Sequence, residues 1–154
     1  MSDGLRGQIM QAMKDAMKSG DKARLSTIRL MQSAIKDKDI ASRTDGRNDG
    51  VPDADLLELF SKMVKQRRES ADLYEKGERP DLVEKERAEI AVLEEFMPKQ
   101  MDEAETKAAV EAVVADLGAS SIKDMGKVMG ALKERYAGQM DFGKAGAVVK
   151  AALG

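Results

Sequence analysis

The side chains of this chain that can take part in chemistry are carboxylates, lysines, arginines and hydroxyls, because the sequence contains no histidine and no cysteine. Serine–histidine and cysteine–histidine catalytic units are therefore excluded. Zinc and copper sites built on imidazole or thiolate ligands are excluded for the same reason. Acid–base catalysis by carboxylates and the binding of a hard cation such as Mg²⁺ remain open.

Glu86 and Glu89 are the carboxylates whose spacing fits such chemistry, because residues three apart share one face of a helix. Other glutamates make most of the same segment acidic, which is typical of a solvated helix face. Neither a histidine nor a pocket-forming motif accompanies the pair. We therefore expect no catalytic residue, no bound metal and no cofactor in this chain.

A basic run lies in the middle of the sequence. Lys62, Lys65 and Arg68 follow one another at three-residue spacing and form one strip of a predicted helix, while Arg67 points elsewhere. Such a strip can neutralise two or three phosphates of a nucleic acid. The favoured alternative is a salt-bridged seam, because glutamates lie four residues from both lysines and the next predicted helix is acidic.

Two glycines interrupt a segment whose hydrophobic residues otherwise recur at helical spacing. Gly126 and Gly130 lie four residues apart, hence on one helix face, with Lys127 beside them. Each glycine is less favourable than alanine by about 1 kcal/mol in a helix interior. Either another helix packs closely against this bare backbone, which is the favoured interpretation, or a ligand or partner contacts it.

The charge of the chain is unevenly distributed. The whole sequence has 26 basic and 28 acidic residues and a pI of about 5.4, whereas many nucleic-acid-binding domains are basic. Residues 118–154 are locally basic, with six basic and three acidic side chains. The basic residues that we expect to contact a partner in this part are Lys123, Lys127, Lys144 and Lys150.

Hydrophobic residues recur at three- and four-residue spacing in seven segments, and no segment alternates as a strand does, so the predicted fold is all-α. Four helices form a domain over residues 1–97, and three short helices form a second domain over 98–154, with Pro98 at the boundary. Asp21, Asp53 and Asp141 are predicted to cap the second, third and seventh helices, and Asp102 with Glu105 forms a capping-box pattern at the start of the fifth. The expected helices lie near residues 3–19, 21–40, 53–76, 80–97, 102–117, 121–138 and 141–153.

Methionine takes the place of aromatic residues, since the chain has 11 methionines and only 3% aromatics. The flexible thioether of methionine fills irregular gaps between helices. We expect five of these residues in the core, namely Met13, Met17, Met31, Met63 and Met129.

The sequence shows no apolar run long enough to span a membrane. The first residues lack the basic start and apolar core of a signal peptide. We therefore expect a cytoplasmic protein with no membrane partner.

Three motifs together resemble the YqeY-like family. They are residues 62–70 (Lys-Met-Val-Lys-Gln-Arg-Arg-Glu-Ser), the pattern Glu86-x-x-Glu89-Ile90-x-Val92-Leu93 followed by Pro98, and Gly126-Lys127-Val128-Met129-Gly130. The resemblance covers nearly the whole chain. It implies an N-terminal helical domain followed by a three-helix domain.

The YqeY-like family is similar to the C-terminal tail of the GatB subunit of tRNA-dependent amidotransferases, which are glutamine-dependent carbon–nitrogen ligases. The resemblance implies tRNA and amidotransferase subunits as partners. This chain has no Ser-Ser-Lys amidase motif and no nucleophile–base pair. The hypothesis is a non-catalytic tRNA-binding or amidotransferase-associated module, and the alternative is a helical protein–protein adaptor that binds no RNA.

Overall fold

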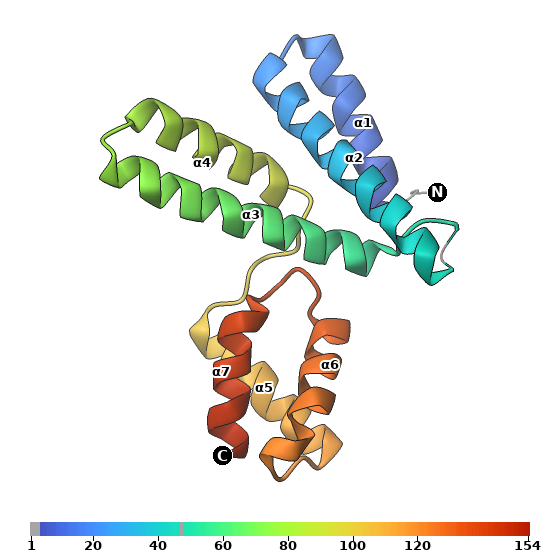
Figure 1. Cartoon of the computed structure of the whole chain (residues 1–154), viewed down its shortest axis with the longest axis vertical. Coiled ribbons are helices and arrows are strands. Elements are labelled where there is room, and N and C mark those ends of the chain that lie inside the picture. The colour runs from blue at the N-terminus through green and yellow to red at the C-terminus, as the bar shows by residue number, and fades with distance from the viewer. Residues whose placement is uncertain (1–3, 47) are drawn as a thin grey trace. The chain divides into compact units, whose positions relative to one another are not determined.

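The computed structural model describes residues 4–46 and 48–154, and within these residues every regular element is a helix (Figure 1). The all-α prediction is therefore confirmed. The chain divides into two compact units, Met1–Met97 and Pro98–Gly154. In the N-terminal unit the helices are α1 (Gly4–Ser19), α2 (Lys22–Ser42), α3 (Asp53–Lys76) and α4 (Pro80–Glu94), with the short 3₁₀ helix η1 (Arg43–Asp45).

The C-terminal unit contains α5 (Glu103–Leu117), the 3₁₀ helix η2 (Ile122–Asp124), α6 (Met125–Arg135) and α7 (Phe142–Leu153). Its three α-helices all pack against one another. Asp102 and Glu105 form the predicted capping box at the start of α5. Helix α6 ends at Arg135, earlier than Gly138, where the sequence predicted its end.

The core of the N-terminal unit is built from large side chains on all four helices. Phe60, Leu56, Ile28 and Leu93 are completely buried, with Ile9 nearly so. Helices α3 and α4 form a long antiparallel hairpin, and α1 and α2 form another (Figure 1). Burying a side chain of this size contributes about 1.5–3 kcal/mol, so these residues dominate the stability of the unit.

The core of the C-terminal unit uses smaller side chains. Leu132 is its largest fully buried residue, and the remaining fully buried large side chains are valines, Val110, Val113, Val128 and Val149. Ala145 is also fully buried, on α7. Small residues let three short helices approach closely and still fill the space between them.

Asp53 does not cap α3, contrary to the prediction. The residue before α3 is Pro52, and Asp53 is the first residue of the helix. The carboxylate of Asp53 instead accepts a hydrogen bond of 3.0 Å from the backbone N–H of Leu5, at the start of α1. It thus satisfies a donor that the first turn of a helix leaves free, and it ties α1 to α3.

The prediction of methionines in the core holds only in part. Met31 and Met63 are buried, and Met13 and Met129 are half-buried against the cores. Met17 is 54% exposed on the outer side of α1, so its prediction was wrong. A four-residue repeat drifts around a helix by about 40° at each step, which carries Met17 past the edge of the buried stripe.

Candidate nucleic-acid interface

The exposed face of α6 lies opposite its buried face. Val128 and Leu132 point into the core and are completely buried. Gly126 and Gly130 are exposed on the other side, and a Cβ added at either would meet no atom of residues 4–46 and 48–154 within 4 Å. The interpretation of these glycines as a helix-packing site is therefore wrong, and the bare backbone of α6 faces open space.

Lysines surround this bare backbone. Lys123, Lys127 and Lys133 are exposed at positions that helical spacing places on the same face as the glycines. None of the three takes part in an ion pair among residues 4–46 and 48–154. The sequence analysis missed Lys133, although its position seven residues after Gly126 marks it as part of the same face.

The start of α6 is fixed by Asp124. Its carboxylate accepts hydrogen bonds of 3.0 and 3.4 Å from the backbone N–H groups of Ser120 and Ser121. These two donors hold the pKa of Asp124 below its ordinary value, and Lys127 adds a smaller effect in the same direction. This carboxylate is thus engaged in the turn before α6. The outer face of α6 carries the lysines together with one exposed carboxylate, Glu134, four residues after Gly130.

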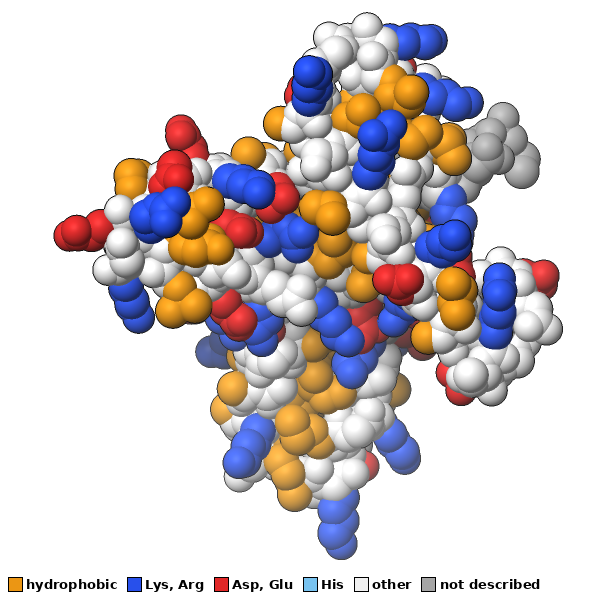
Figure 2. Space-filling view, turned by 45° about the horizontal axis from the view of Figure 1, so that its top comes forward, with side chains coloured by type: hydrophobic (Ala, Val, Ile, Leu, Met, Phe, Trp, Pro, Cys, Tyr) orange, Lys and Arg blue, Asp and Glu red, His pale blue; other side chains and the backbone are white. Residues whose placement is uncertain are grey.

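Helix α7 presents a similar surface. Asp141 caps it by accepting hydrogen bonds from the N–H groups of Gly143 and Lys144, as the sequence predicted. Lys144 and Lys150 are exposed, while Ala145 and Val149 face the core. Figure 2 shows Lys and Arg side chains projecting around the C-terminal unit, with hydrophobic side chains between them.

The second predicted strip, in α3, is divided between solvent and a helix interface. Lys62 and Lys65 are exposed. Arg68 pairs with Glu94 of α4 at 3.0 Å between Nη2 and Oε1. Arg67 and Glu89 lie 3.5 Å apart and are both largely buried between the same helices. The favoured interpretation, a salt-bridged seam, accordingly describes both arginines.

The carboxylates considered for acid–base or metal chemistry do not converge on a site. Glu89 is engaged with Arg67, and Glu86 forms no ion pair within the described part of the chain. Across residues 4–46 and 48–154 no three acidic side chains are grouped so that they could hold a metal ion.

Comparison with known sequences identifies the family. The family model described as "Yqey-like protein" matches residues 6–153. This chain belongs to the YqeY-like family. The resemblance drawn from the three sequence motifs is therefore confirmed.

Several fungal proteins are relatives of this YqeY-like chain. "Altered inheritance of mitochondria protein 41, mitochondrial" of Kluyveromyces lactis is 36% identical over 118 residues, which are 75% of this chain and 60% of that protein. The protein of the same name from Eremothecium gossypii is 37% identical over 89 residues, 58% of this chain and 46% of its own length. An uncharacterized protein of Schizosaccharomyces pombe is 32% identical over 95 residues, 62% of this chain and 73% of its own length.

The YqeY-like chain thus spans only about half of the length of the first two of these relatives. Their names place them in mitochondria, so a cytoplasmic location stays a prediction for this chain. Among the described residues, no helix has both the length and the apolar character needed to cross a membrane.

Proposed function

We propose that this protein is a non-catalytic tRNA-binding module, and that the exposed face of α6, extended by the lysines of α7, contacts the RNA backbone. The observation that carries the proposal is the bare backbone at Gly126 and Gly130, bordered by Lys123, Lys127 and Lys133. Membership of the YqeY-like family supports tRNA as the partner, through the similarity of that family to the GatB tail.

Glycine lowers the stability of the helix that contains it. Gly130 lies in the interior of α6 and makes this helix less stable than alanine would by about 1 kcal/mol. No neighbouring atom in the described part of the chain requires the missing side chain. Close approach of an external backbone accounts for it, because a sugar–phosphate chain can reach the helix surface only where no side chain intervenes. The lysines then neutralise phosphates, which gives binding that is independent of sequence and sensitive to salt.

Substitution of Gly130 separates this proposal from a structural role. Gly130→Ala is expected to stabilise the protein by about 1 kcal/mol, because alanine favours the helix and meets open space. Gly130→Leu is expected to raise the stability by a similar amount, because leucine is nearly as favourable as alanine in a helix, but to abolish tRNA binding. Binding is measured by fluorescence anisotropy with labelled total tRNA at low and moderate salt, and stability by circular dichroism.

Matched controls come from the outer face of α5. Ala108→Leu adds the same side chain at an exposed position of the same unit, and it should bind tRNA like the wild type. Lys127→Gln should reduce the slope of log K against log salt concentration by about one, which corresponds to the loss of one phosphate contact. Lys107→Gln on α5 should leave this slope unchanged. Absence of binding at micromolar protein in low salt, or wild-type affinity of Gly130→Leu, would refute the proposal.

The alternative function is a helical adaptor between proteins. It predicts that the tagged chain co-purifies with a protein that is retained after nuclease treatment, and with no RNA. In that case Gly130→Leu would remove the protein partner and leave the anisotropy of labelled tRNA unaffected.

A further inference from the structure

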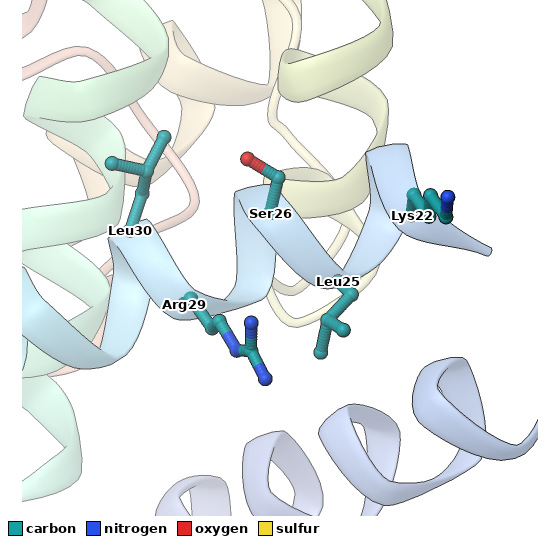
Figure 3. A pocket seen from close by; sticks show the side chains of 5 residues that line it. All are labelled: Lys22, Leu25, Ser26, Arg29 and Leu30. Carbon is teal, nitrogen blue, oxygen red and sulfur yellow. The ribbon is translucent and has the colours of Figure 1, made fainter. Parts of the chain in front are cut away.

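A second surface, far along the sequence from α6, lies on α2 in the N-terminal unit. Five side chains of α2 line an open hollow of about 380 Å³, namely Lys22, Leu25, Ser26, Arg29 and Leu30. Figure 3 shows Leu25 and Arg29 projecting to one side of the helix and Ser26 and Leu30 to the other. The hollow therefore runs along α2 from the partly buried Leu25, which packs against the core, to the exposed Leu30.

The hollow carries positive charge that the protein does not neutralise. Lys22 and Arg29 form no ion pair within residues 4–46 and 48–154, whereas Arg24 of the same helix pairs with Glu95 of α4. Lys36 continues the series beyond the hollow and is also exposed and unpaired in that part of the chain. The three free cations follow at seven-residue spacing, which on a helix places them in one line about 10.5 Å apart.

Large apolar side chains accompany these cations. Leu30 is 45% exposed and Ile40 is 46% exposed, and both lie on the outer side of α2. Figure 2 shows hydrophobic and basic side chains mixed on the α1–α2 hairpin. Leu30 lies beside two unpaired cations, so a fitting partner must offer both apolar and acidic groups. An amphipathic helix offers an apolar face and a charged edge together.

We propose that this face of α2 docks an acidic amphipathic helix of another protein. Seven residues is the spacing at which charged residues recur along one edge of a helix that packs against another, so glutamates at heptad positions can meet Lys22, Arg29 and Lys36 in turn. An apolar side chain of the partner helix packs on the exposed Leu30. A nucleic-acid backbone offers nothing apolar for this leucine.

One acidic residue of α2, Asp37, lies beside the line of cations. It is exposed next to Lys36, and its carboxylate would repel a glutamate of the partner helix. Asp21, at the start of α2, is occupied as the helix cap, since its carboxylate accepts the N–H of Arg24. Asp37→Lys should therefore tighten binding of an acidic helix, by about threefold to tenfold for one reversed surface charge.

The test uses a synthetic peptide of about three heptads, with leucine at the core positions and glutamate at the flanking positions. Binding of the labelled peptide to the full chain is followed by anisotropy. The triple variant Lys22→Glu, Arg29→Glu and Lys36→Glu is expected to weaken binding by roughly tenfold to a hundredfold. The control with the same net charge, Lys76→Glu, Lys85→Glu and Lys107→Glu, reverses exposed lysines on other helices and should bind as the wild type does.

A site-specific probe checks where the peptide binds, because the chain has no native cysteine. A nitroxide on Ser26→Cys should lose mobility when the peptide is added, whereas one on Ala108→Cys of α5 should not. Equal weakening in both triple variants, or an unchanged Ser26→Cys spectrum, would overturn the proposal. So would loss of total tRNA or anionic-vesicle binding only in the α2 variant, since that would assign the face to RNA or to a membrane. Failure of the α6 proposal leaves these results unchanged.

Discussion

The two units of this chain are stabilised by different means. In the N-terminal unit, polar contacts join different helices. They include the ion pairs Arg6–Asp39 and Arg68–Glu94 and the hydrogen bond from the backbone N–H of Leu5 to Asp53. In the described part of the C-terminal unit, Arg135–Asp116 is the only ion pair between helices. The fold of the C-terminal unit therefore rests mainly on its small apolar core. The comparison teaches that ion pairs between helices contribute to the fold of one unit much more than to the fold of the other.

The largest expected effect tests the difference between the two cores. Phe60→Ala should lower the free energy of unfolding of the N-terminal unit by about 3–5 kcal/mol, because a fully buried aromatic ring is lost and a cavity remains. Val149→Ala should cost the C-terminal unit about 2 kcal/mol, since it removes fewer buried methyl groups. Hydrogen exchange at the amides of each unit measures both.

The exposed Leu73, on the same helix as Phe60, supplies the control. It is 67% exposed, so Leu73→Ala should change stability by about 0.5 kcal/mol or less. A similar loss for Phe60→Ala and Val149→Ala would show that the size of core side chains does not distinguish the units.

The sequence predicted those parts of the fold that depend on local signals. The caps Asp21, Asp102 and Asp141 were identified correctly because each bonds to backbone within its own helix. Asp53 was misassigned because its hydrogen-bond partner, Leu5, is 48 residues away. Helical periodicity fixes which residues share a face, but it does not say which distant element covers that face.

The same limit explains what the sequence could and could not show of the candidate sites. The glycine pair of α6 was recognised because glycine destabilises a helix. The sequence favoured close helix packing as the explanation, whereas the structure places open space around Gly130. The outer face of α2 was missed altogether. Lys22, Arg29 and Lys36 share one face of the predicted helix by their spacing, but the sequence does not show that this face of α2 is uncovered.

The ion pair between Arg6 and Asp39 predicts that the stability of the N-terminal unit falls in acid. The guanidinium of Arg6 donates hydrogen bonds of 2.9 and 2.8 Å to the carboxylate of Asp39, which also accepts the N–H of Val51. The Arg6 contact, followed by that of Val51, lowers the pKa of Asp39. A carboxyl group with a lowered pKa in the folded state stabilises the fold above its unfolded pKa of about 4. That stabilisation is lost as the pH falls below this value.

Asp39→Asn should destabilise the N-terminal unit by about 1–3 kcal/mol at neutral pH, because a charged hydrogen-bonded pair is broken. The variant should also lose stability less steeply than the wild type below about pH 4. Urea unfolding followed by circular dichroism across the acid range measures both effects. Asp72→Asn, at an exposed position of α3, is the control, and an equal acid response in the wild type and Asp39→Asn would contradict the assignment.

The smallest expected effect concerns backbone conformation in the turns of the two units. Glu78, between α3 and α4, has a φ of +57°, while the neighbouring Gly77 has an ordinary φ of −83°. In the C-terminal unit, the described residues with positive φ are glycines, including Gly118 at the end of α5. Glu78→Gly should therefore stabilise the N-terminal unit by about 1 kcal/mol, and Gly118→Ala should destabilise the C-terminal unit by a similar amount. An added Cβ at Gly118 meets no atom of the described residues within 4 Å, so Gly118→Ala changes backbone strain without changing packing. Melting temperatures that shift in opposite directions in the two variants would support the role of backbone strain. Shifts in the same direction would contradict it.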